Sequence, residues 1–373
     1  MKMRVLSSAS ILIGMIVGAG YLAIPYVVMK SGFVIGLVNM IIVGLLIMLT
    51  MLYLSEVILR TKKQHQIVGY AEQYLGKTGK RMMTFSMTIG ICAALIAYLT
   101  AQGESWSHLL FNTAQYSLHS AIIFWLVMSA LSYFGLRVLK KEAPIGIILI
   151  TIMVILIAFT TASKINIDNL TYINPANFFI PFGVILFSFL GYSSLPEVAI
   201  SLGKERGKLG KAVILALSFV FIIYLLFTFF VLGSQGSQTP EIATIALGKI
   251  FIVLGIITML GAYLALSVTM EDILRADFGK SRTRAWLYSI FVPLILYLII
   301  KLFNLATFST VLSVGGVISG GVTITTILWM TYKAKQSSER KPEFSVPYSK
   351  FLAFLIILLF AAAIIFQIYA ILS

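Results

Sequence analysis

Two segments of this sequence combine glycine and proline inside long apolar runs, where the backbone itself could bind a ligand. The first reads GYLAIP over residues 20–25, and the second reads GYSSLP over residues 191–196. Both residue types disfavour a continuous helix, because glycine costs conformational entropy and proline lacks the N–H that a helix needs. We therefore predict a broken helix at each segment, with free backbone N–H and C=O groups.

Free backbone groups at such a break can bind both charges of a zwitterion without an ionised side chain. Small residues at Gly18, Ala19 and Gly20 let a ligand approach the N–H groups that begin the outer half-helix, and these groups suit a carboxylate. Carbonyl groups at the end of a half-helix suit an ammonium group. On the second segment the predicted carbonyls precede Gly191 and belong to Phe187, Ser188 and Phe189.

Three glutamates lie within or beside the apolar runs, where an ionisable group is a candidate proton carrier. Glu197 directly follows the second glycine–proline segment and is the candidate nearest to a predicted break. Glu104 has His108 four residues later on the same helical face, so this pair could share a proton. Glu56 has Arg60 at the same spacing, and we interpret these two as an ion pair at a helix end.

The elements that must position these groups are membrane-spanning helices. The 373 residues are 60% hydrophobic and only 11% charged, which leaves too little polar surface for a soluble domain. Eleven apolar stretches are each about 20 residues long, enough for a helix to cross the hydrocarbon core. Barrel strands would alternate in polarity, and these stretches do not. The predicted spans cover residues 5–29, 34–59, 82–111, 119–137, 143–161, 178–202, 211–233, 242–270, 285–301, 305–330 and 350–372.

Basic residues predict the orientation of these spans and explain the net charge of +15 without a nucleic-acid partner. With a cytoplasmic N-terminus, 24 of the 28 Lys and Arg residues fall in cytoplasmic segments, and four fall outside. We therefore expect a multi-pass protein of the plasma membrane, with the N-terminus inside and the C-terminus outside. The basic cytoplasmic segments are residues 2–4, 60–81, 137–141, 204–211, 275–284 and 333–350.

The two glycine–proline segments occupy the first and sixth spans, which run in opposite directions because each crossing reverses the chain. This placement is typical of a five-plus-five inverted repeat whose broken helices meet at the membrane midplane. We expect a single all-α polytopic transmembrane domain over residues 1–373. Repeat one covers about 5–161, repeat two about 178–330, and an eleventh helix about 350–372.

Several segments resemble the amino acid/auxin permease family, which includes bacterial aromatic amino acid permeases and belongs to the amino acid–polyamine–organocation superfamily. Residues 14–32, GMIVGAGYLAIPYVVMKSG, are similar to its first helix, residues 187–197 to its sixth and residues 262–272 to its eighth. The resemblance implies a LeuT-like fold and amino acid transport. It also implies substrate contacts by Val17, Gly18, Ala19, Gly20, Phe187, Ser188 and Phe189.

The same resemblance implies that the third helix walls the substrate pocket. Tyr98, Gln102 and Ser105 follow one another at i, i+4 and i+7 and therefore share one face of that helix. Packing between helices is an equally good explanation for Tyr98.

The eighth helix bears on the coupling ion. Sodium-coupled relatives place hydroxyl groups there, beside the broken first helix, whereas this sequence has Gly261 and Ala262. The departure argues against sodium coupling and leaves proton coupling or simple exchange, although Ser267 and Thr269 lie only a turn or two further along.

Taken together, the residues and the resemblance predict a secondary active transporter that moves neutral amino acids by alternating access, because we see no counter-charge deep in the pocket. The alternative is a membrane-embedded amino-acid sensor on the same fold with little transport. An enzyme is not predicted, since one cysteine and three histidines offer no convergent catalytic or metal site. We expect no cofactor and no metal, and as partners only the substrate and the bilayer; the oligomeric state stays open.

Overall fold

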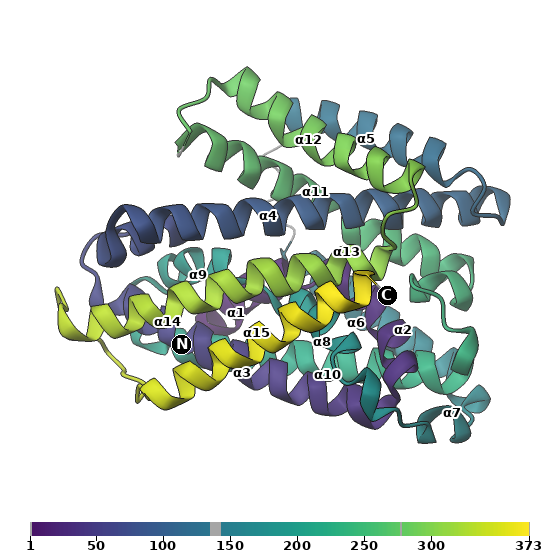
Figure 1. Ribbon diagram of the computed structural model, residues 1–373, viewed down its shortest axis with the longest axis horizontal. Coiled ribbons are helices and arrows are strands. Elements are labelled where there is room, and N and C mark those ends of the chain that lie inside the picture. Colours follow the sequence, from purple (N-terminus) through teal and green to yellow (C-terminus); the bar gives the residue numbers. More distant parts are fainter. Residues whose placement is uncertain (1, 135–142, 277, 373) are drawn as a thin grey trace.

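The structure is a computed structural model that describes residues 2–134, 143–276 and 278–372, and the regular elements of these ranges are all helices (Figure 1). The predicted cytoplasmic residues Arg137, Lys140 and Lys141 lie outside the described residues. The two termini lie toward opposite ends of the helical bundle in Figure 1.

The first predicted span is broken, as its glycines and proline lead one to expect. Helix α1 (Lys2–Ile16) ends before the Val17–Ala19 stretch, a short 3₁₀ helix η1 (Gly20–Ala23) follows, and α2 (Ile24–Ser31) completes the span. The two halves are bent by 57° relative to each other. Pro25 sits in the first turn of α2, where its missing N–H leaves no helical hydrogen bond unmade.

The sixth predicted span is broken in the same way. Helix α8 (Ile180–Phe189) is followed by the non-helical residues Leu190 and Gly191. The 3₁₀ helix η5 (Tyr192–Ser194) comes next, and α9 (Leu195–Leu202) completes the span. Pro196 again occupies the first turn of the second half-helix. The predicted pair of broken helices in spans one and six is thereby confirmed.

The remaining spans form continuous or locally distorted helices. Length and composition alone identify eight helical stretches of the described residues that could cross a membrane, or nine with α1 and α2 joined. One of these stretches, residues 175–238, contains both the sixth and the seventh predicted spans. The fourth predicted span corresponds to a shorter apolar helix of 17 residues, which is not counted among the eight. These spans are α3 (Phe33–Arg60), α4 (Ile67–Phe111), α5 (Ser117–Tyr133), α6 (Ala143–Thr161), α10 (Leu209–Gln235), α11 (Lys249–Ala276), α12 (Arg282–Leu302), α13 (Phe308–Gly315) with α14 (Gly321–Gln336), and α15 (Lys350–Leu372).

Two helices depart from the simple predicted spans. Helix α4 begins at Ile67 instead of near residue 82, because the polar stretch before the span is itself helical and is broken only at Gly76, where φ is +64°. Between α13 and α14 lies a π-helix, η9 (Gly316–Gly320). A Cβ on Gly316 would lie 2.3 Å from the carbonyl oxygen of Gly183, so this glycine permits close contact with α8.

Short helices cover the ends of the bundle, and two of them matter for the site. The 3₁₀ helix η6 (Gly203–Lys208) joins α9 to α10, and η8 (Ala243–Leu247) precedes α11 and contacts η1. The others are η3 (Ala162–Lys164), α7 (Asp168–Thr171), η4 (Pro175–Asn177) and η7 (Gly236–Gln238).

Helix α4 divides the molecule into two groups of helices. Figure 1 shows α5, α11 and α12 on one side of α4, and α1, α8, α9 and α10 on the other. Within the second group α1 packs against α6, α9 and α10, and α2 packs against α8 and α10. The two broken spans therefore lie side by side, next to the long helix that carries Tyr98.

Candidate functional site

The breaks of the two spans touch each other because glycine occupies the contact points. A Cβ on Gly20 would lie 2.5 Å from Ser188 Oγ and 3.0 Å from Ser188 Cα, too close for any side chain. On the sixth span, a Cβ on Gly191 would lie 2.5 Å from Ile16 Cγ1. The glycines that sequence reasoning selected for ligand access thus also let the two backbones meet.

Tyr98 of α4 reaches the break of the first span, on the face that the sequence predicted. Its hydroxyl oxygen accepts a hydrogen bond from the Ala19 N–H at 3.3 Å. A Cβ on Gly18 would lie 2.3 Å from the same hydroxyl oxygen, so Gly18 makes room for this contact. The Tyr98 ring packs edge-on against Tyr263 of α11, with ring centroids 6.3 Å apart, which fixes its position.

Tyr224 of α10 connects both breaks and was not selected from the sequence. Its hydroxyl is 3.3 Å from the carbonyl oxygen of Ile16, at the end of α1, and 3.1 Å from that of Ser188, near the end of α8. The ring stacks on Tyr21 and meets Phe189 edge-on, and it is fully buried. Ser188 and Ile16 lie 36 and 208 positions away from Tyr224 in the sequence. A tyrosine in an apolar helix carries no local signal for such distant partners, so the sequence alone does not identify this role.

The other predicted site residues lie at different distances from the breaks. Val17 and Phe189 are buried in the core, and the ring of Phe187 lies beside Gly315 of α13. The amide nitrogen of Gln102 donates to the carbonyl oxygen of Ile256 on α11 at 3.0 Å. Ser105, on the same face of α4, is buried, and its hydroxyl has no hydrogen-bond partner among the described residues.

Of the predicted proton carriers, Glu197 lies beside the sixth-span break and Glu104 faces a lysine on another helix. Glu197 is exposed on α9, just beyond the break of the sixth span. The Glu104 carboxylate lies 4.0 Å from Lys301 Nζ of α12, which sequence reasoning did not select. Nearby, Glu241 accepts hydrogen bonds from the N–H and the hydroxyl of Ser309, both at 3.0 Å.

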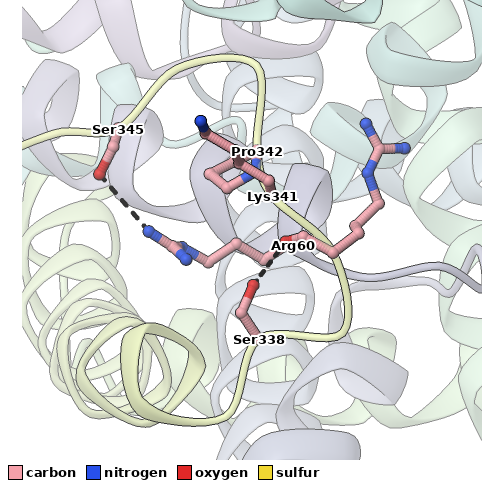
Figure 2. Close-up of a pocket in the computed structure, with 6 residues that line it drawn as sticks. Arg60, Ser338, Lys341, Pro342 and Ser345 are labelled. Carbon is pink, nitrogen blue, oxygen red and sulfur yellow. Dashed lines mark hydrogen bonds between the residues drawn. The ribbon is translucent and has the colours of Figure 1, made fainter.

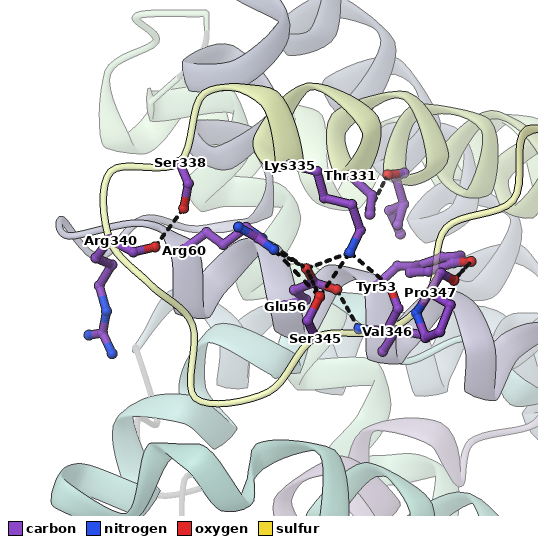
Figure 3. A network of polar contacts seen from close by, with 11 residues as sticks. Tyr53, Glu56, Arg60, Thr331, Lys335, Ser338, Arg340, Ser345, Val346 and Pro347 are labelled. Atoms are coloured by element: carbon purple, nitrogen blue, oxygen red, sulfur yellow. Dashed lines mark hydrogen bonds and ion pairs between the residues drawn. The ribbon is translucent and has the colours of Figure 1, made fainter.

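Glu56 forms the predicted ion pair and a larger network at the other end of α3 (Figure 3). Its carboxylate lies 2.7 Å from the Arg60 guanidinium and 2.7 Å from Lys335 Nζ, and its side chain is 0% exposed. It also accepts from the Ser345 hydroxyl at 2.9 Å and the Val346 N–H at 2.8 Å. Glu56 therefore holds the α14–α15 connection against α3 through hydrogen bonds, and we interpret its role as structural.

A surface cavity of about 410 Å³ opens beside this network (Figure 2). It lies at the Arg60 end of α3, whereas the breaks lie in the interior of spans one and six. Its lining residues are Arg60, Ser338, Arg340, Lys341, Pro342 and Ser345.

The acidic, histidine and cysteine side chains and the hydroxyls of α11 are arranged as follows in the described residues. Within the described residues, no cluster of three or more His, Cys, Asp or Glu side chains could hold a metal ion. On α11, the Ser267 hydroxyl donates to the Tyr263 carbonyl and the Thr269 hydroxyl to the Ala265 carbonyl, each one turn back in the same helix. Gly261 and Ala262 offer no hydroxyl.

Comparison with a solved structure identifies the fold. The crystal structure of MhsT in complex with L-phenylalanine matches 98% of this chain and 98% of its own chain, with a TM-score of 0.70 at 14% sequence identity. The all-helical LeuT-like fold that the family resemblance implied is thereby confirmed.

Comparison with known sequences identifies the family. Glutamine transporter 2 of Aliivibrio fischeri (strain ATCC 700601 / ES114) is 24% identical over 240 residues, which are 63% of this chain and 62% of the relative, so the match spans less than two thirds of that relative. The model of the tryptophan/tyrosine permease family matches residues 1–246. The prediction of an amino acid permease family is confirmed, with this family in place of the broader amino acid/auxin permease name. Family and fold are those of a multi-pass membrane transporter and not of an enzyme, and the chain belongs to the tryptophan/tyrosine permease family.

Proposed function

We propose that this protein is a secondary active transporter that moves neutral amino acids across the membrane by alternating access. The observation that carries the proposal is the meeting of two broken spans, where Gly20 touches Ser188 and where backbone groups of both spans are free of helical hydrogen bonds. Such breaks bind both ends of a zwitterion with backbone dipoles inside the membrane.

The substrate carboxylate binds at the start of the outer half of the first span. The Ala19 N–H lies there, and its present acceptor is the Tyr98 hydroxyl. A carboxylate can take this hydrogen bond from Ala19 and accept a second one from Tyr98, whose proton is then free to turn toward it. Tyr98 thus exchanges an internal hydrogen bond for a stronger, charge-assisted one.

The substrate ammonium group binds at the carbonyl oxygens of Ile16 and Ser188. Both point toward the Tyr224 hydroxyl, which has one proton for two acceptors. An ammonium group brings three donors and therefore satisfies these acceptors better than Tyr224 does alone. None of the side chains that hydrogen-bond at the breaks in the described structure carries a formal charge, which favours a substrate with an uncharged side chain.

Protons drive the transport in this proposal, with Glu104 and Glu197 as the candidate carriers. The lack of hydroxyls at Gly261 and Ala262 supports protons over sodium. The cytoplasmic N-terminus, the outer C-terminus and the location in the plasma membrane follow from the distribution of basic residues. The two inverted repeats cover residues 5–161 and 178–330.

The test is uptake of radiolabelled neutral amino acids by proteoliposomes, with a proton gradient and, separately, a sodium gradient imposed. We expect accumulation that requires the proton gradient. Accumulation with the sodium gradient alone would refute proton coupling. If an amino acid raises the thermal stability of the purified protein but is not accumulated, the protein is a sensor, and the transporter proposal fails.

A further inference from the structure

The surface cavity at the end of α3 is lined by positive charge and takes no part in the proposed transport path. Its volume is about 410 Å³, within the range of about 300–1,000 Å³ that small-molecule sites occupy. Among the described residues that line it, none is a carboxylate. Its charged and hydroxyl-bearing lining residues are Arg60, Arg340, Lys341, Ser338 and Ser345 (Figure 2).

The buried carboxylate of Glu56 neutralises only part of this charge. It is shared by Arg60 and Lys335, at 2.7 Å from each, so two cations and one anion leave one positive charge uncompensated. The Arg60 guanidinium also donates to the Ser345 hydroxyl at 3.5 Å (Figure 2). Arg60 is therefore held in place at the cavity while its charge is only partly balanced.

Two further carboxylates near the cavity are engaged by other groups. Glu339 accepts hydrogen bonds from the Lys62 N–H at 2.8 Å and from the Gln73 amide at 2.7 Å. Glu343 forms an ion pair with Arg340. Neither carboxylate is left to neutralise the remaining cation of the cavity.

Lys341 is this remaining cation, and the backbone before it is held in place. Its side chain is exposed and forms no ion pair with another described residue. The N–H of Arg340 donates to the Arg60 carbonyl at 3.2 Å, and the Ser338 hydroxyl donates to the Arg340 carbonyl at 2.5 Å. Because these bonds fix the chain against the end of α3, the cavity is complementary to an anion with several acceptor oxygens.

The cavity lies where three membrane-spanning helices begin or end. Helix α3 ends at Arg60, α14 ends at Gln336 and α15 begins at Lys350. Beside it the rings of Tyr332 and Tyr348 lie 5.9 Å apart, and Lys350 Nζ lies 5.1 Å from the centroid of the Tyr332 ring. Tyrosine and lysine gather in this way at the membrane–water interface, so the anion that this cavity meets is a lipid headgroup.

We propose that this cavity binds the phosphate-bearing headgroup of an anionic phospholipid, and that the bound lipid stabilises the α14–α15 connection. Basic pockets between membrane helices bind such headgroups on the cytoplasmic side, where the basic residues of this sequence place the cavity. Lys341 and Ser345 belong to the connection and Arg60 belongs to α3, so one headgroup joins the two. Binding here requires neither transport nor a particular coupling ion.

The experiment measures binding from the rise in melting temperature of the delipidated protein, in neutral detergent micelles, as lipid is added. Phosphatidylglycerol is the probe, phosphatidylcholine is the lipid without net charge, and glycerol 3-phosphate is a soluble source of the same phosphate chemistry. We expect phosphatidylglycerol to raise the melting temperature at concentrations where the other two do not. An equal rise with phosphatidylcholine would overturn the site, and tighter binding of glycerol 3-phosphate would overturn the lipid as its ligand.

Two variants that each remove two positive charges locate the binding. Arg340→Gln with Lys341→Gln should raise the apparent Kd for phosphatidylglycerol about tenfold or more, because each basic residue near an anionic headgroup adds to the attraction. The matched control is Lys204→Gln with Lys211→Gln, two exposed lysines of η6 and α10 that do not line the cavity, and its Kd should stay within about twofold. Equal Kd values in these two variants would overturn the site.

A charge-preserving variant separates loss of charge from loss of fold. Arg340→Lys with Lys341→Arg keeps both positive charges and should bind phosphatidylglycerol within about threefold of the unmodified protein. If this variant loses as much affinity as Arg340→Gln with Lys341→Gln, the charge of the cavity does not bind the lipid and the proposal fails.

Discussion

Replacing Glu56 by alanine should destabilise the protein strongly, because Glu56 is the centre of a buried charge network. Its carboxylate lies between Arg60 and Lys335, at 2.7 Å from each, and also binds Ser345 and Val346 of the α14–α15 connection (Figure 3). Removing it leaves Arg60 and Lys335 without their counter-charge and the Val346 N–H without its acceptor, and it removes the contacts that hold the connection to α3.

The size of this effect follows from burial. Removing one partner of a buried ion pair costs about 3–5 kcal/mol, because the remaining charge stays desolvated. The Lys335 and Arg60 side chains keep 22% and 14% of their exposure, so water can solvate part of each charge. We therefore expect the lower end, about 3 kcal/mol, which lowers the folding equilibrium constant by about 150-fold.

Reversible unfolding of the purified protein in mixed micelles measures this change. The matched control is Glu72→Gln, since Glu72 is 47% exposed and its ion pair with Lys80 contributes about 0–1 kcal/mol. Glu56→Gln should fall between, because the amide keeps the shape but loses the charge. If the free energy of unfolding of Glu56→Ala lies within about 1 kcal/mol of that of the unmodified protein, the network does not stabilise the fold, and the effect expected from burial is refuted.

Three further substitutions test the proposed function. Tyr98→Phe removes the acceptor for the Ala19 N–H and the second donor to the carboxylate, and substrate competition should show KM raised about tenfold with the same amount of folded protein. Tyr224→Phe leaves the carbonyl oxygens of Ile16 and Ser188 without their donor, and initial uptake rates should fall by about tenfold; unchanged rates would mean that Tyr224 only packs. Glu104→Gln should abolish accumulation driven by a proton gradient while exchange of internal for external substrate persists, and Glu197→Gln should have this effect instead if Glu197 is the carrier.

Much of the fold can be predicted from sequence because the membrane makes simple demands. Each crossing needs about 20 apolar residues in a helix, so hydropathy alone locates the spans. The breaks were predictable because glycine and proline disrupt helices through local chemistry, at Gly20 and at Gly191 alike. The start of α4 at Ile67 was missed because a polar helix beyond the membrane has no hydropathy signal.

The site was predictable only where local pattern decides it. Tyr98 lies at the first break. Its place on the pocket-facing side of α4 was predictable from helical spacing together with the family resemblance. The contacts of Tyr224 were not predictable, because they join α10 to two carbonyls that lie far away in the sequence. Likewise, Lys301 comes within 4.0 Å of Glu104 through tertiary packing of α12 on α4, which helical spacing alone does not indicate.

The central claim is that substrate passes where the two broken spans meet, and Gly20→Ala tests it most directly. Its added methyl group would lie 2.5 Å from Ser188 Oγ, whereas the same change at Gly146 on α6 meets no atom within 4 Å. Both variants must be folded and monodisperse. We predict that Gly20→Ala lowers the rate of proton-driven uptake of neutral amino acids by about tenfold or more, which corresponds to an activation free energy raised by about 1.4 kcal/mol. Gly146→Ala should leave this rate unchanged. Uptake by Gly20→Ala at the rate of the unmodified protein would contradict the account.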